Sequence, residues 1–384
     1  MDPDLSELDS FLDSDGYLID DDSADSDQRY LSGFDAHDPF FTLYDGENGE
    51  THLLVSGLEY GRARKESRAD SVSRYSDYDY QYGSTEERHR MLADFLADHD
   101  VSSLAVPARF PLATADGLRE RDIEVAAETD DVLTTIRAVK TDAEVDHIRE
   151  AQRANERAME RAETLLREAT VEDGLLVHDG RELTSERVRR EIEIELLERD
   201  HALDETIVAC GPDAADPHDR GSGPLRPNET IVIDIFPKSK ESNYHADMTR
   251  TFSVGEPAET AREWYELTAE AKGAALDAIE PGATGEDVHD AVCDVYEEAG
   301  LPTLRDDPST ETGFIHSTGH GIGLDVHELP RLAPGGEELE PGHVITVEPG
   351  LYDPEVGGVR IEDLVVVTES GYENLTDYPE EFVL

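Results

Sequence analysis

Four acidic residues lie in or beside apolar runs, where a carboxylate is costly. They are Asp234 in IVIDIF, Asp247 at the start of DMTRTFSV, Glu348 at the end of ITVEP and Glu362 in VRIEDLVVV. An ionised carboxylate that is buried without a partner costs several kcal/mol. One such residue could be a structural acid with its own hydrogen bonds. Four of them, for which Arg250 and Arg360 are too few and no lysine is near, predict bound cations.

A glycine-rich segment supplies histidines that would complete such a site. The stretch HSTGHGIGLDVHE, residues 316–328, holds His316, His320 and His327, three of the 14 histidines of the chain. Glycines beside His320 let the backbone pass close to a metal without a Cβ clash. Two divalent ions would balance four carboxylates, and one neutral imidazole and a bridging hydroxide would complete their coordination. Oxygen donors with one nitrogen suit Mn²⁺, which we expect, or Co²⁺ or Zn²⁺ as alternatives.

The candidate ligands fall in the second of two regions that differ in pattern, residues 133–384. It opens with the long helical pattern TDAEVDHIREAQRANERAMERAETLLREA, whose capping box is Thr141 and Glu144. A second helix, SERVRREIEIELLERD, precedes the strands ETIVAC and TIVIDIF. Two more helices, residues 258–279 and 285–299, precede the strands VITVEP and VRIEDLVVV. The order helix, helix, strands therefore occurs twice and predicts two similar halves around a mixed sheet.

The first region, residues 1–132, has the pattern of a smaller α/β domain. Residues 40–44 and 52–56 flank a turn with glycine and predict a hairpin. A capping box at Ser84 opens the helix STEERHRMLADFLADHD, and the strands SSLAVP and IEVAAE lie on either side of a short helix. The polar, tyrosine-rich residues 65–84 predict a surface loop.

The charge of the chain is its most unusual global property. It has 91 acidic and 33 basic residues, a formal net charge of −58. Such self-repulsion weakens a compact state at ordinary ionic strength, whereas in molar salt the screening length falls to about 3 Å. The acids run through every predicted helix instead of forming one patch, which favours adaptation to a salty cytoplasm over a cationic partner. A nucleic-acid partner is not expected, because no basic stripe could meet phosphates.

The sequence shows no membrane-spanning segment and no signal-peptide pattern. No apolar run approaches the roughly 18 residues that span a bilayer. The first residues are acidic where a signal peptide is basic, and no apolar core follows them. Cys210 and Cys293 match no metal or redox spacing and are predicted to be small core residues. We therefore expect a soluble, cytoplasmic protein with no membrane partner.

Four segments taken together resemble a known enzyme family. They are HADMTRTFSVG, HSTGHGIGLDVHE, ITVEPGLY and GGVRIEDLVVVTESG. This set is similar to the metallopeptidases of the pita-bread fold, which include aminopeptidase P, prolidase and methionine aminopeptidase. The resemblance implies an α+β pita-bread catalytic domain with pseudo-twofold halves over residues 133–384. It also implies a creatinase-type α/β domain over residues 1–132, for which YLSGF at 30–34 is the main cue.

The resemblance assigns a role to each candidate ligand. Asp234 would chelate one metal ion, and His320 and Glu348 would hold the other. Asp247 and Glu362 would bridge both ions. The interval between the two aspartates is slightly longer than the family's, which places a small insertion in the hairpin PKSKESNYHA.

Further residues are predicted around the ligands. His327 resembles the residue that hydrogen-bonds the scissile carbonyl, and His316 and His218 resemble histidines that line the substrate pocket. Arg360 resembles a residue that braces a ligand, and Arg331 an arginine that meets the carboxylate of a dipeptide. His316 and His218 could instead be surface loop residues, and each arginine could pair with an unrelated acid.

The implied activity is removal of the N-terminal residue from Xaa-Pro peptides by a homodimer. Hydroxide bound between two metals would attack the first peptide bond, and Glu348 would carry the proton to the leaving nitrogen. Proline preference comes from the resemblance alone, and dipeptidase and longer-peptide activity both stay open. The rival of a different class is a non-catalytic peptide- or protein-binding module of the same fold. Such modules usually lose ligands, whereas all five are present here.

Overall fold

The computed structural model describes residues 5–80 and 83–384, which form two compact units, residues 1–137 and 138–384. Unit 1 contains one six-stranded sheet in the order β4-β3-β2-β1-β5-β6. Its elements are α1 (Ser6–Phe11), β1 (Gly16–Asp21), α2 (Ser26–Ser32), β2 (Phe40–Asp45), β3 (Glu50–Val55), α3 (Tyr60–Glu66), β4 (Ser71–Arg74), the 3₁₀ helix η1 (Tyr75–Tyr78), α4 (Thr85–Asp98), β5 (Ser103–Pro107), α5 (Leu112–Arg119), β6 (Glu124–Glu128) and α6 (Val132–Ala138).

Most predicted elements of unit 1 are confirmed, and one is wrong. The β2–β3 hairpin, the capping box of α4 and the parallel strands β5 and β6 match the expectations. Within the predicted surface loop, however, β4 pairs in parallel with β3, and Tyr75 and Tyr78 pack against the core. The strand is polar because it lies at the sheet edge, so it shows no apolar alternation. Residues 81–82 of that stretch lie outside the described part of the chain.

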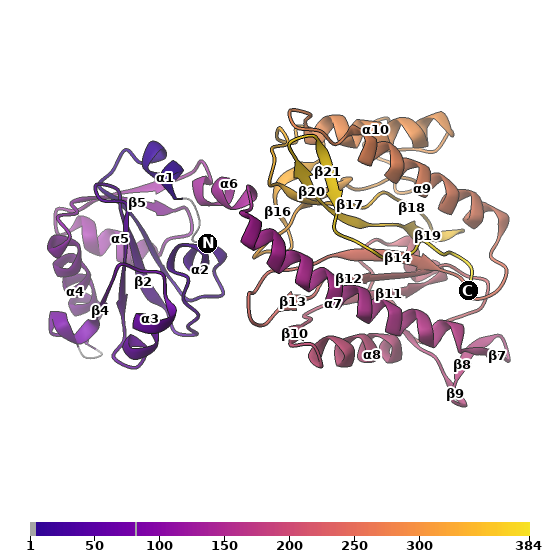
Figure 1. Ribbon diagram of the computed structural model, residues 1–384, viewed down its shortest axis with the longest axis horizontal. Helices are drawn as coiled ribbons and strands as arrows, with labels where there is room; N and C mark the ends of the chain where they lie inside the picture. Colours follow the sequence, from indigo (N-terminus) through magenta and orange to yellow (C-terminus); the bar gives the residue numbers. More distant parts are fainter. Residues whose placement is uncertain (1–4, 81–82) are drawn as a thin grey trace. The chain divides into compact units, whose positions relative to one another are not determined.

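Unit 2 consists of two helix-covered halves. Figure 1 shows α9 and α10 above its strands and α8 below them. The first half comprises α7 (Asp142–Arg167), β7 (Thr170–Glu172), β8 (Leu175–His178), β9 (Arg181–Glu182), α8 (Ser185–Leu197), β10 (His201–Ala202), β11 (Thr206–Cys210), the 3₁₀ helix η2 (Gly211–Ala215), β12 (Ile231–Ile235), β13 (Lys238–Ser239) and β14 (Met248–Phe252). The second comprises α9 (Glu259–Ala278), α10 (Gly285–Glu298), β15 (Gly319–Gly321), β16 (Glu328–Leu332), β17 (Val344–Val347), β18 (Gly350–Asp353), β19 (Gly357–Arg360), β20 (Asp363–Thr368) and β21 (Gly371–Asn374).

Each half of unit 2 has its own core. In the first, apolar side chains of α7 and α8 pack on the antiparallel sheet β11-β12-β14. In the second, α9 and α10 pack on β17–β20, of which β17 and β20 belong to the antiparallel sheet β16-β15-β17-β20-β21. The predicted long helices are confirmed, including the capping box at Thr141, and the structure adds a capping box at Thr284. This arrangement of two helix–sheet halves is the predicted pita-bread fold, and the candidate ligands lie on or next to strands of both halves.

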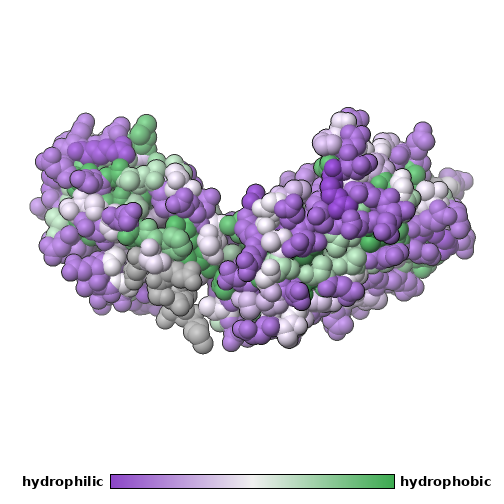
Figure 2. Space-filling model, turned by 90° about the horizontal axis from the view of Figure 1, so that it is seen from above, coloured by the Kyte–Doolittle hydropathy of each residue, from purple (hydrophilic) through white to green (hydrophobic). Residues whose placement is uncertain are grey.

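Acidic side chains are mostly at the surface. Hydrophilic residues cover most of the face visible in Figure 2. Among the described residues, those acids that are buried form a short list: Asp20, Asp27, Asp45, Glu144, Asp234, Asp247, Glu328, Glu362 and Asp363. Three of the five candidate ligands are therefore in this buried minority, and their environment needs an explanation. Within the described part of the chain, no helix is long and apolar enough to cross a membrane.

Candidate metal centre

The five predicted ligands come from five different places in unit 2. Asp234 is on β12, Asp247 immediately precedes β14, and His320 is on β15. Glu348 follows β17, and Glu362 lies between β19 and β20. The two halves of unit 2 thus contribute to one site, although nearly 130 positions separate the first ligand from the last.

The structure brings these side chains together. Asp247, His320 and Glu362 each offer a ligand atom, and these three atoms lie within 4.8 Å of one another. His320 Nε2 is 3.4 Å from Glu348 Oε1 and 4.0 Å from Asp247 Oδ2. Oxygen donors with one imidazole nitrogen are the ligands that Mn²⁺, Co²⁺ and Zn²⁺ share.

Unsatisfied buried oxygens indicate that the site is built for cations. Asp234 Oδ1 and Asp247 Oδ1 are buried, and neither finds a hydrogen-bond partner among the described residues. A buried polar atom without a partner costs about 1–3 kcal/mol, and more when it is charged. A divalent ion would satisfy both oxygens at once, so the donor set fits the predicted metals.

The electrostatics of the ligands lead to the same conclusion. Burial raises the pKa of Asp247 well above its usual range, and the nearby Glu362 and Asp234 raise it further. Burial likewise raises the pKa of Glu362 well above its usual range, with Glu348 and Asp234 adding to the effect. Burial raises the pKa of Glu348 to about 8, against the opposing charge of Arg360. Carboxylates crowded in this way ionise fully only when cations join them.

The neighbouring acid Asp363 provides an internal comparison. It directly follows Glu362 and is also buried, which by itself would raise its pKa. Arg250 and Lys272 more than offset that effect and lower the pKa of Asp363 below its usual value. Two adjacent buried carboxylates therefore differ in how far protein cations offset their burial. Arg250 and Lys272 outweigh it for Asp363, whereas Arg360 does not outweigh it for Glu362.

The imidazole of His320 is suited to bind a metal. Burial lowers its pKa to about 4, with the nearby His327 adding to the effect, so the ring is neutral at pH 7. Its Nδ1 lies 3.0 Å from the carbonyl oxygen of Gly321, which leaves Nε2 directed at the carboxylates. A metal-bound histidine normally donates its other ring N–H in this way.

Close backbone packing explains the glycines beside His320. A Cβ on Gly319 would lie 2.0 Å from the carbonyl oxygen of Thr346 on β17. A Cβ on Gly321 would lie 2.0 Å from the carbonyl oxygen of Leu329 on β16. Since real Cβ atoms do not approach backbone this closely, only glycine lets β15 fit between its two neighbours. The register of β15 with β16 also shifts between His320 and Gly321, which gives the ribbon its irregular form.

Arg360 orients one ligand directly and a second through a threonine. Its Nη2 donates to Asp234 Oδ2 at 2.6 Å, and its Nε donates to Thr249 Oγ1 at 3.1 Å. The Thr249 hydroxyl donates in turn to Glu362 Oε2 at 2.7 Å. Arg360 also donates to the Tyr352 hydroxyl at 2.9 Å. This planar fork fixes carboxylate positions that a flexible lysine would leave free.

The predicted histidines gather beside the ligands. His316 Nε2 lies 3.0 Å from the Tyr352 hydroxyl, and burial lowers the pKa of this histidine to about 3. The His327 ring stands edge-on to His320, with ring centroids 4.4 Å apart. Burial lowers the pKa of His327, and the charge of His218 lowers that of both His327 and His316. His218 itself is exposed on the loop before β12.

Arg331 has a different environment from the other predicted site residues. It lies on β16, where it pairs in register with His320. Its side chain is 59% exposed and its Nη2 is 2.7 Å from Glu337 Oε1. Its predicted contact with a substrate carboxylate stays a prediction.

Sequence reasoning missed two hydroxyl residues that complete the network, Thr249 and Tyr352. Thr249 is fully buried and follows Asp247 at the two-residue period of a strand, which puts both on one face. That period was the available signal. Tyr352 accepts from Arg360 and lies within hydrogen-bonding distance of His316, and nothing in its sequence neighbourhood indicates this.

Comparison with known proteins identifies the family. The family model described as metallopeptidase family M24 matches residues 146–369, and that of the creatinase/prolidase N-terminal domain matches residues 10–139. The chain belongs to metallopeptidase family M24. It is therefore a metallo-hydrolase that acts on peptides, and the family implies divalent metal ions at the site described above.

Several relatives of this M24 peptidase have names that include dipeptidase. The Xaa-Pro dipeptidase of Pyrococcus furiosus is 30% identical over 357 residues, 92% of each chain. The probable dipeptidase PepE of Mycobacterium tuberculosis (strain ATCC 25618 / H37Rv) is 36% identical over 283 residues, 73% of this chain and 68% of that protein.

Solved structures show the same fold over almost the whole chain. The prolidase from Pyrococcus horikoshii OT3 matches with a TM-score of 0.79 and 28% identity, and covers 98% of this chain and 99% of its own. The X-Pro aminopeptidase from Thermotoga maritima matches with a TM-score of 0.80 and 26% identity, covering 99% and 100%. A protein named prolidase and one named X-Pro aminopeptidase thus resemble this M24 peptidase to nearly the same degree in fold.

Proposed function

We propose that this M24 peptidase is a dinuclear-metal exopeptidase that releases the N-terminal residue from Xaa-Pro peptides, with dipeptides preferred. The convergence of Asp234, Asp247, His320, Glu348 and Glu362, with unsatisfied oxygens on two of them, is the observation that carries the proposal. Relatives named Xaa-Pro dipeptidase support the proline preference and the short substrate. A binding module without catalysis would not need five intact ligands.

The ligand set accounts for the proposed reaction. Two divalent ions held here, Mn²⁺ by our proposal, would lower the pKa of bound water and polarise the peptide carbonyl. Glu348, whose Oε1 lies 3.4 Å from His320 Nε2, is assigned the transfer of a proton from the attacking water to the leaving nitrogen, as the family resemblance implies. His327 is neutral at that pH, since burial lowers its pKa, and one ring N–H can donate to the carbonyl oxygen.

The remaining predicted residues define the substrate pocket. His316 is held by the Tyr352 hydroxyl, which Arg360 holds in turn, so that side of the pocket is rigid. His218 is exposed and close enough to His327 and His316 to lower the pKa of both, which suits a residue that meets the substrate. Proline leaves a tertiary amide nitrogen with no N–H, so its recognition depends on the shape of this pocket.

The working environment of the enzyme is part of the proposal. We propose that it works in a cytoplasm of high salt, because the net charge is −58 and the acids lie mostly at the surface. We also propose a homodimer, on the family resemblance alone. The sequence has five lysines. Two of them, Lys140 and Lys272, are buried in ion pairs, so few lysines are left to offset the charge of the surface acids.

The decisive experiment compares two substrates at one metal and salt concentration. The protein is purified in molar KCl, loaded with Mn²⁺ and given an Xaa-Pro dipeptide or an Xaa-Pro-Xaa tripeptide. We expect cleavage of the dipeptide with a higher kcat/KM than the tripeptide. Faster tripeptide cleavage would assign an aminopeptidase P instead, and cleavage of neither would refute the proposed function.

A further inference from the structure

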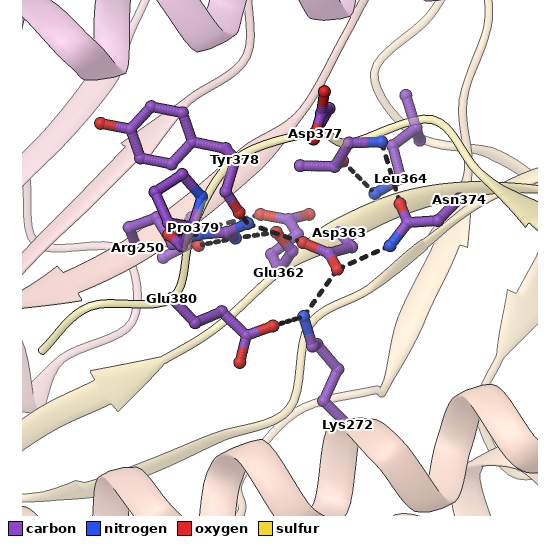
Figure 3. Close-up of polar contacts among 12 residues, drawn as sticks. Arg250, Lys272, Glu362, Asp363, Leu364, Asn374, Asp377, Tyr378, Pro379 and Glu380 are labelled. Carbon is purple, nitrogen blue, oxygen red and sulfur yellow. Dashed lines mark hydrogen bonds and ion pairs between the residues drawn. The ribbon is translucent and has the colours of Figure 1, made fainter.

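A buried cluster of charged side chains lies beside the candidate ligand Glu362 (Figure 3). We call it the rear ion cluster and define it as Arg250 on β14, Lys272 on α9 and Asp363 on β20. Their side chains are 1%, 5% and 6% exposed, respectively. The three residues have no role in the function proposed above.

Arg250 uses every N–H donor of its guanidinium. Its Nη1 donates to the carbonyl oxygens of Thr249 at 3.0 Å and Glu362 at 2.6 Å. Its Nη2 donates to Asp363 Oδ1 at 2.8 Å and to the carbonyl oxygen of Tyr378 at 2.9 Å. Its Nε donates to the carbonyl oxygen of Pro379 at 3.1 Å. Four of these five acceptors are backbone, so the contacts fix chain positions and do more than pair charges.

Two of those backbone acceptors belong to or lie near the two predicted bridging ligands, Glu362 and Asp247. Thr249 follows Asp247 by two residues on β14, which belongs to the three-stranded sheet. Glu362 directly precedes β20 of the five-stranded sheet. The Glu362 N–H also donates to the carbonyl oxygen of Thr249 at 3.1 Å. Arg250 therefore joins the two halves of unit 2 at the point where each supplies a bridging carboxylate.

Asp363 and Lys272 attach the same junction to the C-terminal segment, residues 374–384. Asp363 Oδ2 accepts from Lys272 Nζ at 2.6 Å and from Asn374 Nδ2 at 2.9 Å. Lys272 also contacts Glu380. Ser253, which directly follows β14, also forms two backbone hydrogen bonds with the C-terminal segment, at residues 382 and 384. The segment is thus held by the cluster and closes over its rear side.

We propose that Arg250 is a positioning residue that sets the spacing of Asp247 and Glu362, and that the C-terminal segment locks it in place. The inference rests on the proposed dinuclear function, because spacing matters only if both carboxylates bridge two ions. A buried ion pair alone is weak evidence for stability, since apolar residues can replace it. What apolar residues cannot replace is a planar fork with five donors, and lysine supplies only three from a single nitrogen.

Arg250→Lys tests this directly, because it keeps the charge opposite Asp363 and loses the fork. Arg137→Lys is the matched control: Arg137 is also buried, 2.7 Å from Asp27, but lies in unit 1. Each full-length protein is titrated with Mn²⁺ in molar KCl. The number of ions bound, the exchange-coupled EPR signal of a Mn²⁺ pair, and kcat and KM for an Xaa-Pro dipeptide are then measured.

For Arg250→Lys we expect the affinity for the second ion to fall about 10–100-fold, the range for residues that orient metal ligands. The coupled EPR signal should weaken and kcat should fall by a similar factor with little change in KM. Arg137→Lys should match the wild type in all three measurements. Wild-type metal binding, coupling and kcat in folded Arg250→Lys would overturn the inference, and so would equal losses in Arg137→Lys.

A second variant covers the case in which Arg250→Lys does not fold. Asp363→Asn can keep an oxygen acceptor for Arg250 Nη2, but it puts an NH2 group where Lys272 Nζ and Asn374 Nδ2 now donate to Oδ2. It therefore loosens the junction from the side of the C-terminal segment, and we expect a loss of second-ion affinity of about 10-fold. Unchanged affinity in this variant would overturn the inference. Failure of the proposed function looks different: the wild type itself would bind fewer than two ions or show no coupled signal.

Discussion

The buried ion pair between Lys140 and Glu328 gives the sharpest stability prediction. Lys140 Nζ lies 2.6 Å from Glu328 Oε2, and the two side chains are 1% and 2% exposed. Glu328 Oε1 also accepts from the Asp325 N–H at 3.0 Å, and Glu328 directly follows His327. The pair therefore links the start of α7 to the turn that carries a predicted catalytic histidine.

Replacing Lys140 by methionine keeps most of the length of the side chain and removes its charge. The buried pair with Glu328 would then be broken, which costs about 3–5 kcal/mol. In a domain of roughly 150–250 residues, each 1 kcal/mol lowers Tm by about 2–4 °C. We therefore expect Lys140→Met to lower the Tm of unit 2 by about 6–20 °C, and to lower kcat because the His327 turn loses its anchor.

Thermal and denaturant unfolding in molar KCl measure this effect. The double variant Lys140→Met/Glu328→Gln should recover most of the loss, because a neutral amide does not need the cation. Lys65→Met is the control, since Lys65 is exposed on α3 and such changes usually stay within about 0.5 kcal/mol. A loss in Lys140→Met no larger than that of Lys65→Met would refute the reasoning.

Three further predictions concern the metal, the salt and the pH. His320→Ala should lower bound Mn²⁺ from about two ions per chain and abolish hydrolysis, as metal analysis and dipeptide assays would measure. The control His37→Ala, at an exposed histidine, should change neither. A full metal complement in His320→Ala would contradict the ligand assignment. Dialysis from molar to millimolar KCl should unfold the protein, because self-repulsion at a net charge of −58 is then unscreened; an unchanged circular dichroism spectrum would show that the acids serve another purpose. Burial lowers the pKa of His52 to about 4, below its unfolded value of about 6.5, so the unfolded chain binds the proton first and stability is lost as pH falls through that window. His52→Gln should therefore flatten the acid limb of unit 1 unfolding, by about 2 kcal/mol at most, and an acid limb as steep as that of the wild type would remove His52 as its cause.

The candidate metal ligands could be predicted from the sequence because they conflict with their surroundings. Asp234 and Glu362 stand in apolar stretches of the sequence, and a carboxylate there has few explanations besides a cation. The fold could also be predicted from the sequence, because N-terminal capping residues and apolar periodicity mark the helices of both halves. Such signals are local, so one chain is enough to detect them.

The residues that the sequence did not reveal depend on partners far along the chain. Arg250 is the largest fully buried side chain among the described residues. Four of its five hydrogen-bond acceptors lie at residues 362–379, more than 100 positions along the chain. Tyr352 looks like an ordinary strand tyrosine until Arg360 and His316 meet its hydroxyl. Strand β4 was missed for a related reason. Its own sequence has no strand pattern, and it is a strand because it pairs with β3.

The attachment of residues 378–380 behind the bridging carboxylates has a consequence for synthesis. Domains form as units while the ribosome delivers the chain, beginning at the N-terminus. Unit 1 is complete by residue 137, but the junction held by Arg250 lacks two of its acceptors until residues 378 and 379 have left the exit tunnel. We therefore expect a nascent chain to stay inactive until residues 378 and 379 have emerged, and to bind its metal ions only after that point.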